Sequence, residues 1–559
     1  MFGNWRTVLK NLSPASIQPP LPRDQLLLGE PPDEESVPLD VLFVGGGPAG
    51  LAGAIRLAQR VERDRKNGGP LADLEIGVLE KSSELGEHCL SGAVVNPEAL
   101  KALYPDMSMN DFPLRQAVTS ERVYLLTKNS KIRLPTPPTM KNHGNYVASL
   151  CEIVRWLGGK AEELGVNIFT GFPAASLLLN SGRVSGVRTT ASGLDRDGVA
   201  ATGYMPPMDL SARVTVLAEG TRGPLSQAWL ESQEVSSDNP QIFALGVKEL
   251  WRVRRPIGAV THTLGWPLPR DAFGGSFIYP MSDELVALGL VVGLDAPYAD
   301  LDVHDLLQAF KQHPLVAKIL NEGELVEWGA KTIPEGGYHA IPHRLSGDGL
   351  LLTGDVAGFV DVAALKGIHY AMRSGIFAAD TIYDGLVHGD TSAEALSAYD
   401  VKIRSSLKKD TLYRTRNMRL AFKKGFFSGG LRAGLMQLTH GSFPSRRIPS
   451  GEDASHPRNH KLGIAPVYDG QKTFSKLDGV FRSGNVTRDD IPSHLIVGSE
   501  ISAEMASLYE RLCPAGVYER DGDRLVIRAP NCIDCKATDV IGPRWTPREG
   551  GSGPSYKRM

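Results

Sequence analysis

The chain has 559 residues, of which 42% are hydrophobic, and a formal net charge of −2 at pH 7. This length exceeds what one hydrophobic core usually supports, so we expect two or three domains. The near-neutral charge gives no bias toward nucleic acid, and no apolar run reaches the ~18 residues that a membrane-spanning helix needs. Residues 1–37 lack the apolar core of a secretory signal. We expect an N-terminal arm there, with a cleaved organellar presequence as the alternative.

A strand, a glycine turn and a helix open the first predicted domain. The apolar residues 41–44 predict a buried strand, and the spacing Gly45-x-Gly47-x-x-Gly50 after it fits the dinucleotide-binding fingerprint. Gly45 permits the tight turn, Gly47 lets a pyrophosphate approach the backbone, and Gly50 allows the helix to pack closely on the strand. The helix N-terminus offers N–H groups to the phosphates. We therefore predict a dinucleotide site at Val44, Gly45, Gly46, Gly47, Pro48, Ala49 and Gly50.

An acidic residue at the end of a second predicted strand supports this site. Residues 76–79 predict the strand, and Glu80 stands where a carboxylate accepts hydrogen bonds from a ribose hydroxyl. Glu80 follows Gly45 by 35 positions, more than the ~20 of the compact motif, because a polar stretch at 60–70 lengthens the helix and its loop. Lys81 is included in the predicted cofactor site. The alternative is a glycine-rich turn in an unrelated α/β protein.

A second, largely β domain is predicted inside the first. Residues 214–217 predict a strand that ends near Gly220 and returns beside the first strand, next to the nucleotide. From about residue 241 the pattern changes to longer strands, which indicates a substrate-type domain over 241–335.

The first domain then resumes. An apolar strand at 350–353 ends in Gly354-Asp355, and a helix is predicted to begin near Gly367. An ordinary strand-end aspartate and helix cap would give the same pattern. The dinucleotide domain is therefore predicted to be discontinuous, comprising residues 38–240 and 336–400.

Residues 401–445 combine basic side chains with an apolar, glycine-containing patch. Lysines and arginines crowd a predicted helix up to Lys424, and the patch follows at 425–436. This combination suits an anionic membrane surface. A solvated basic helix that packs on its own protein explains it equally well.

Three of the 5 cysteines, Cys513, Cys532 and Cys535, lie near the end of the chain. An odd, end-loaded set is not typical of a secreted disulfide framework. It indicates a metal site in a reducing compartment.

Short motifs in all three predicted regions of the chain are, taken together, more specific for a protein family than any one of them alone. They are His143-Gly144-Asn145-Tyr146, Lys248-Glu249-Leu250-Trp251, Gly265-Trp266-Pro267-Leu268, Gly274-Gly275-Ser276-Phe277, residues 285–295, residues 513–519 and residues 549–554. Taken in order from about residue 40 to residue 559, they resemble the electron transfer flavoprotein–ubiquinone oxidoreductase family.

The resemblance implies a mixed α/β and α+β fold. A discontinuous Rossmann-type FAD domain would carry an inserted β-rich quinone-binding domain at 241–335 and a C-terminal ferredoxin-like domain at 446–559 with one [4Fe–4S] cluster. The family is monotopic on an inner membrane, which would place this chain peripherally on the cytoplasmic or matrix face. Electrons would arrive singly from reduced electron transfer flavoprotein and leave as ubiquinol.

The resemblance also implies roles for particular residues. The adenine end of FAD would contact Gly45, Gly47, Gly50 and Glu80, with Gly354 and Asp355 at the second phosphate and the ribityl chain. The helix after Gly367 would aim N–H groups at the flavin pyrimidine oxygen. Gly274 and Gly275 would line the quinone headgroup site, although on sequence alone they equally fit a β-turn. The catalytic residues and the proton donor stay open, with His262 and His369 as candidates only.

The predicted cluster site departs from the family pattern of Cys-Pro followed by Cys-x-x-Cys-x-x-Cys. Here Cys513-Pro514 is followed by Cys532 and Cys535, and Thr538 stands at the fourth ligand position. Clusters of this type ordinarily use four thiolates. A cubane with an oxygen ligand from Thr538, Asp534, Asp539 or water, a three-iron cluster, and a domain without a cluster all stay open. A zinc site is less favoured because no fourth soft ligand accompanies the cysteines.

Two other readings of the whole chain compete with the leading one. A soluble FAD monooxygenase or prenyl reductase would share the fold, but would not need the cysteine-bearing tail. A cluster-less docking homologue would bind a flavoprotein without turnover. Lys423, Lys424 and Arg432 interrupt the stretch that the family inserts into the membrane, so we expect shallower, more electrostatic attachment.

Overall fold

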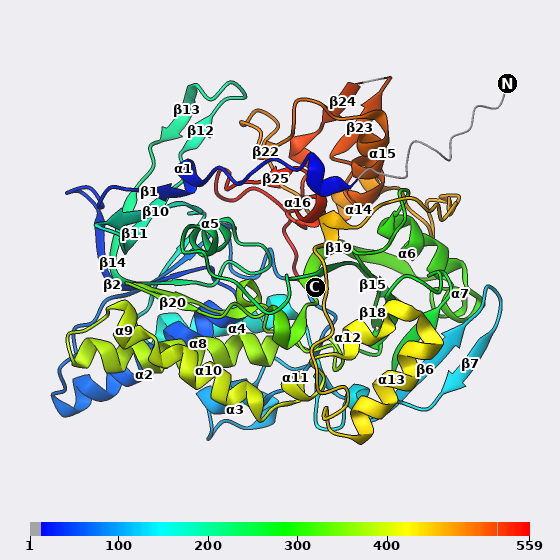
Figure 1. Cartoon of the computed structure of the whole chain (residues 1–559), viewed down its shortest axis with the longest axis horizontal. Coiled ribbons are helices and arrows are strands. Elements are labelled where there is room, and N and C mark those ends of the chain that lie inside the picture. The colour runs from blue at the N-terminus through cyan, green and yellow to red at the C-terminus, as the bar shows by residue number, and fades with distance from the viewer. Residues whose placement is uncertain (1–12, 523) are drawn as a thin grey trace.

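The structure, a computed structural model, describes residues 13–522 and 524–559, so residues 1–12 of the predicted arm lie outside the described part. Two sheets stand side by side, and the C-terminal elements lie across one edge of both (Figure 1). The remainder of the predicted arm packs on the protein. Its β1 (Leu27–Leu28) pairs with a strand of the first sheet, and Leu26 beside it is buried.

The first sheet has a parallel centre around β2 (Val37–Val44). β2 pairs in parallel with β3 (Ile76–Glu80) and with β14 (Asp209–Leu217). β9 (Asn167–Thr170) continues the sheet beyond β3, and β21 (Leu350–Leu352) pairs in parallel with β14. β3 and β21 are almost entirely apolar and buried, and β2 and β14 end in buried apolar residues, as expected for strands at the centre of a parallel sheet. The other members are β10 (Ala174–Asn180), β11 (Arg183–Thr189) and β20 (Ser346–Gly347).

Glycines let two long helices cross closely on this sheet. α2 (Pro48–Asn67) begins directly after the glycine turn, and α8 (Ile368–Val387) packs along it. An added Cβ at Gly375 of α8 would lie 2.1 Å from the Ala49 carbonyl oxygen, so no larger residue fits there. The crossing brings the N-terminal turns of both helices to the edge where the parallel strands end.

The second sheet contains the strands predicted between residues 241 and 295. It has seven strands in the order β19-β15-β18-β17-β16-β6-β7 and is antiparallel except where β6 meets β16. The hairpin of β6 and β7 comes from residues 121–134, which the sequence assigned to the first domain. The strands are β6 (Glu121–Leu126), β7 (Lys131–Leu134), β15 (Phe243–Arg252), β16 (Val260–Gly265), β17 (Gly274–Pro280), β18 (Leu285–Gly293) and β19 (Glu324–Pro334).

A buried ion pair joins this sheet to α6 (Val303–Gln312). The Lys311 ammonium lies 2.8 and 2.9 Å from the two carboxylate oxygens of Glu249. Both side chains are fully buried, and the Trp251 indole N–H donates to the same carboxylate at 2.6 Å. The charged pair is therefore satisfied inside the core, as buried charges require.

The C-terminal region shares a hydrophobic core with the second sheet. An added Cβ at Gly479 would lie 2.8 Å from the Trp328 ring of β19, so the two parts are in close contact. The elements of this region are α14 (Lys476–Arg482), α15 (Ala503–Leu512), α16 (Ala537–Ile541), β22 (Leu495–Ile496), β23 (Tyr518–Asp521), β24 (Arg524–Ile527) and β25 (Arg544–Trp545).

The final residues run back into the first domain. Met559 is buried, and its carbonyl oxygen accepts from the Ser149 hydroxyl and the Cys151 N–H at the start of α4 (Leu150–Glu163). Tyr556 is buried as well, and the backbone N–H of Lys557 donates to the Glu327 carboxylate of β19. The tail therefore ties the first domain to the second sheet.

Residues 401–445 form short helices, of which α10 (Ala398–Lys408) packs on α8 of the first domain while α12 (Met418–Ala421) and α13 (Phe426–Leu438) lie below the second sheet in Figure 1. Another short helix, α11 (Thr411–Arg414), stands between α10 and α12 in the sequence. Among the described residues, none of the helices combines the length and the apolar character needed to cross a bilayer.

Candidate functional site

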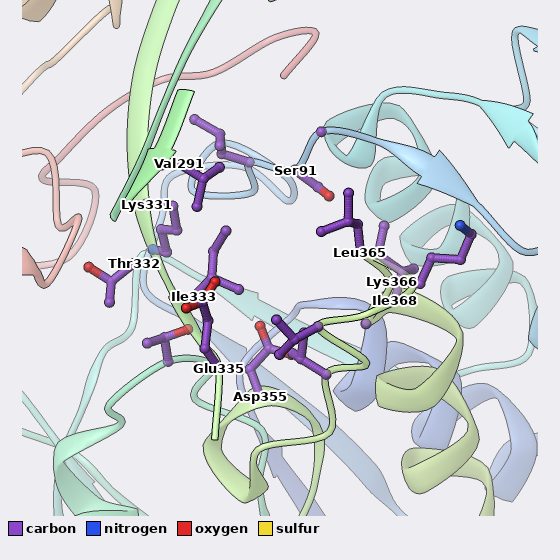
Figure 2. A pocket seen from close by; sticks show the side chains of 18 of the residues that line it. Ser91, Val291, Lys331, Thr332, Ile333, Glu335, Asp355, Leu365, Lys366 and Ile368 are labelled. Atoms are coloured by element: carbon purple, nitrogen blue, oxygen red, sulfur yellow. The ribbon is translucent and has the colours of Figure 1, made fainter. Parts of the chain in front are cut away.

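One cavity of about 1090 Å³ lies between the two sheets and reaches the C-terminal region. Figure 2 shows Lys331 and Ile333 of β19, with Glu335 just after the strand, on one side of it and Asp355 and Leu365 on the other. This volume exceeds that of a typical small-ligand pocket, about 300–1,000 Å³. Most of the predicted site residues line it: Val44, Gly45, Gly47, Pro48, Ala49, Glu80, Lys81, Gly220, Gly274, Gly275, Gly354, Asp355 and Gly367.

The three fingerprint glycines have different surroundings. Gly45 has a φ of +115°, and an added Cβ there would lie 2.4 Å from the Ala218 carbonyl oxygen. A Cβ at Gly50 would lie 2.1 Å from the Gly45 carbonyl oxygen. Gly47 has no atom within 4 Å of its Cβ position and lines the cavity. Gly45 and Gly50 are therefore required by the turn itself, whereas Gly47 leaves open space for a ligand.

Glu80 is fixed at the end of β3 by three hydrogen bonds. One carboxylate oxygen accepts from the Gly46 N–H at 3.0 Å, and the other accepts from the N–H and the hydroxyl of Ser82, both at 2.9 Å. The Gly46 N–H therefore holds the glycine turn to the end of the neighbouring strand β3. Glu80 also lines the cavity, where a ribose hydroxyl would meet it.

A second polar edge of the cavity lies where β21 meets α8. The Gly354 N–H donates to the Ser374 hydroxyl at 2.9 Å, which places Asp355 on the cavity wall. Burial raises the pKa of the Asp355 carboxyl to about 6, and the Lys331 ammonium partly offsets this. Gly367 precedes the 20-residue helix α8, so its first-turn N–H groups begin at the same wall.

The cavity wall is bare backbone at Gly274 and Gly275. An added Cβ would lie 2.1 Å from the Val291 carbonyl oxygen at Gly274 and 2.8 Å from the Thr263 carbonyl oxygen at Gly275. No side chain fits at either position without displacing the neighbouring strand. The two glycines belong to β17, so the predicted alternative of a β-turn is wrong.

The two candidate histidines differ in position. His262 lines the cavity, and its Nε2 lies 2.7 Å from the Tyr279 hydroxyl. Burial and the Lys366 ammonium lower the pKa of His262 to about 4. His369 does not line the cavity; its ring packs on Tyr370 with centroids 4.1 Å apart. Of these two candidates, His262 is therefore the one positioned to face a ligand.

The three C-terminal cysteines are buried in one hydrophobic cluster, where cations and backbone amides offset only part of the cost of a thiolate. Burial raises the pKa of all three thiols, to about 12 for Cys532. Nearby cations and backbone amides act in the opposite direction. The ammonium of Lys476 lowers the pKa of Cys513, the guanidinium of Arg548 that of Cys532, and the ammonium of Lys331 that of Cys535. Backbone N–H groups lower it as well, those of Ala515 and Val517 at Cys513, of Asp534 at Cys532, and of Ala537 at Cys535. Converging buried thiols with such partners fit an iron–sulfur group.

The fourth ligand position carries an alcohol. Thr538 is half-buried in α16, and its Oγ1 lies 3.4 Å from the Tyr518 hydroxyl. Tyr518 is 1% exposed, and all three cysteines are near enough to raise the pKa of its hydroxyl. Thr538 and the three cysteines therefore have Tyr518 as a common neighbour.

Both acidic alternatives to Thr538 are occupied by other partners. Asp534 accepts from Arg548 at 2.9 Å and from the Trp545 indole at 3.0 Å, and it also pairs with Lys81. Asp539 pairs with Arg222 and accepts from the Trp545 N–H at 2.8 Å. Neither carboxylate is free to take a metal without leaving cations unpaired.

The sequence analysis missed several residues near the cluster loop. His494 has a ring nitrogen that lies within 4.8 Å of the ligand atoms of Cys532 and Asp534, and both of its nitrogens are buried without a partner. Lys536 and Trp545 of the same region line the cavity, with the ammonium 3.4 Å from the ring centroid. The sequence carried one signal for these residues, the position of Lys536 directly after Cys535.

The segment containing α12 and α13 closes one side of the cavity. Arg419 is buried between Glu335 at 2.9 Å and Asp295 at 2.8 Å, and Phe422 lines the cavity beside it. On the outside of α13, Leu431 is 71% and Leu438 is 78% exposed. The segment therefore presents apolar side chains to the surroundings next to the cavity.

The glycine turn, Glu80 and the discontinuous parallel sheet define a Rossmann-type flavoprotein oxidoreductase. The solved structure of a geranylgeranyl bacteriochlorophyll reductase-like protein from Thermoplasma acidophilum has this fold, with a TM-score of 0.56 and 18% identity over 77% of this chain and 94% of that chain. Residues 243–333 match the family model "ETF-QO, ubiquinone-binding", and residues 470–557 match "Electron transfer flavoprotein-ubiquinone oxidoreductase, 4Fe-4S".

Whole-chain relatives agree with these matches. The mitochondrial electron transfer flavoprotein-ubiquinone oxidoreductase of Oryza sativa subsp. japonica is 39% identical, covering 94% of both chains. The Homo sapiens enzyme of that name is 36% identical, covering 93% of this chain and 89% of its own length. The chain belongs to the electron transfer flavoprotein–ubiquinone oxidoreductase family.

Proposed function

We propose that this protein accepts electrons from reduced electron transfer flavoprotein and passes them, through FAD and the cluster domain, to ubiquinone. The observation that carries the proposal is the shared cavity, whose wall combines Gly47 of the glycine turn, Gly275 of the quinone-binding family match, and Lys536 beside the cluster cysteines. FAD, when bound, supplies a carrier that takes electrons singly and delivers two.

The residues proposed to hold FAD are those that line the cavity at the carboxyl-terminal ends of the parallel strands. Gly47 and the first turn of α2 accommodate the pyrophosphate, Glu80 accepts from the ribose, and Asp355 accepts from the ribityl chain. The first N–H groups of α8, after Gly367, point a positive dipole end at the ring system. Lys331 adds a cation on the opposite side of the cavity.

Gly274 and Gly275 are proposed to hold the quinone headgroup. A planar ring lies flat against a wall without side chains, and a backbone N–H is available to its carbonyl. Substituting Gly275→Ala should raise the KM for a soluble quinone about tenfold, which corresponds to about 1.4 kcal/mol. Gly246→Ala, which narrows the same wall with its Cβ 3.5 Å from Val291, should have a similar but smaller effect.

The matched control is Gly258→Ala, at an exposed loop position with open space around it. Flavin content measured for each variant separates loss of the fold from loss of quinone binding. An unchanged quinone KM in both Gly275→Ala and Gly246→Ala, at full flavin content, would place the quinone elsewhere.

Peripheral attachment to an inner membrane, on its cytoplasmic or matrix face, is proposed for the surface of α13. The exposed Leu431 and Leu438 offer apolar contacts, and Arg432 on the same helix suits anionic headgroups. The relatives named above are mitochondrial proteins by name. This location beside the cavity would give a lipid-soluble quinone a short path to Gly274 and Gly275.

The deciding experiment measures quinone reduction by the purified protein with and without reduced electron transfer flavoprotein. Turnover that requires the protein donor supports the proposal. A monooxygenase or prenyl reductase would instead turn over with NAD(P)H or a ferredoxin. A docking homologue would bind the donor without reducing quinone.

A further inference from the structure

We propose that the cluster of this protein is site-differentiated, with Cys513, Cys532 and Cys535 each holding one iron and the Thr538 hydroxyl facing a fourth, weakly held iron. The protein would then interconvert between a three-iron and a four-iron form according to the supply of ferrous ion and electrons. This inference deepens the proposed function, on which it rests for the presence of a cluster, but it concerns only the binding of iron.

The first argument is the asymmetry between the three cysteines and Thr538. Cys513, Cys532 and Cys535 are buried in one hydrophobic cluster. Thr538 is instead near the neutral Tyr518 hydroxyl, 3.4 Å away. The chain therefore offers three buried thiols and one alcohol at the four ligand positions.

The second argument is that the alternatives to Thr538 are already engaged. Asp534 accepts from two cations and an indole, and Asp539 is held by Arg222 and a backbone N–H. Taking either as a ligand would leave a buried cation unpaired, which is strongly unfavourable. His494 is a competitor, because a ring nitrogen lies within 4.8 Å of the ligand atoms of Cys532 and Asp534 and neither nitrogen has a partner. The experiment below therefore tests it directly.

An alcohol binds iron more weakly than a thiolate because it is neutral and harder. The fourth iron therefore leaves first. Oxidation of the cubane in its 2+ state releases one ferrous ion and one electron, leaving the three-iron cluster in its 1+ state. In the reverse direction the three-iron cluster takes one electron from dithionite and then binds one ferrous ion, which restores the cubane.

The test uses the full-length holoprotein, purified without oxygen and treated with ferricyanide. Iron and acid-labile sulfide should fall from equal amounts to about three irons per four sulfides, with the low-temperature spin resonance of an oxidised three-iron cluster. Ferrous ion plus dithionite should restore the fourth iron. Thr538→Cys should keep all its iron under the same treatment, and Thr538→Val should need at least tenfold more ferrous ion for restoration.

His494→Gln provides the control for the competing ligand and should behave as the unchanged protein. Loss of ferrous-ion uptake in His494→Gln but not in Thr538→Val would overturn the proposal, as would full iron retention in the ferricyanide-treated protein. A preparation with flavin but no iron or sulfide would overturn it as well. Quinone reduction, measured on the same samples, reports separately on the proposed function, because its failure beside an intact three-iron signal contradicts only that function.

Discussion

Replacing Gly47 and Gly50 by alanine, one at a time, separates cofactor binding from folding. At Gly50 the new Cβ would lie 2.1 Å from the Gly45 carbonyl oxygen, so α2 must move by about 1 Å to reach an ordinary contact. Overpacking of this kind costs about 1–3 kcal/mol of stability. Gly47→Ala meets no atom within 4 Å, and its φ of −85° suits any residue. The free energy of unfolding of the flavin-free protein should therefore change by at most about 0.5 kcal/mol.

Flavin binding should be weakened by Gly47→Ala, the variant that leaves stability nearly unchanged. The Gly47 methyl group would occupy the space where the pyrophosphate approaches the first turn of α2. Losing one hydrogen bond to a charged oxygen costs about 1.5–3 kcal/mol, so FAD should bind roughly 10- to 100-fold more weakly. Titration of the deflavinated protein with FAD, followed by fluorescence quenching, measures the Kd, and denaturant unfolding measures stability. A Gly47→Ala protein that binds FAD within about twofold of the unchanged protein would refute the reasoning.

Three further predictions concern stability and attachment. Lys311→Met should cost about 3–5 kcal/mol in denaturant unfolding because it leaves the Glu249 carboxylate buried and uncompensated, and the Glu249→Gln/Lys311→Met double variant should recover part of the loss. Burial and Asp295 raise the pKa of Asp453 to about 8, so the contribution of Asp453 to stability is greatest below its unfolded pKa of about 4 and is lost as the pH rises toward 8. Between pH 5 and pH 7 the free energy of unfolding should fall by about 1 kcal/mol per pH unit, and this pH dependence should flatten in Asp453→Asn. High salt should release much of the protein from anionic vesicles in flotation assays, whereas retention until detergent is added would contradict a mainly electrostatic attachment.

The sequence predicted those features whose cause is local. The glycine turn needs a bare Gly45 and Gly50 because the neighbouring backbone lies too close for a Cβ, and this requirement appears directly as residue type. Glu80 was expected from its position at a strand end, and it lines the cavity. The family match was predicted from motifs in order, and the whole-chain relatives confirm it.

Pairings between distant segments could not be predicted in the same way. A strand pattern carries no information about its partner, so the hairpin at residues 121–134 gave no sign that β6 pairs in parallel with β16 in the second sheet. For the same reason the tail was not expected to place Met559 against Ser149. Both contacts depend on the position of complete domains, which no local pattern encodes.

The contacts around Asp534 explain why the flavin cavity and the cluster loop form one unit. Asp534 stands between two cluster cysteines, yet it pairs with Lys81, the residue after the proposed ribose acceptor. Another partner, the Trp545 indole, lines the cavity. On the far side, Lys331 of β19 lines the cavity and donates to the Asp534 carbonyl at 3.2 Å. The cluster loop is therefore fixed to both sheets through groups that line the cavity. Because the Asp534 carboxylate is buried, a shift of the loop would leave its charge without these partners, so the contacts hold the loop against the cavity.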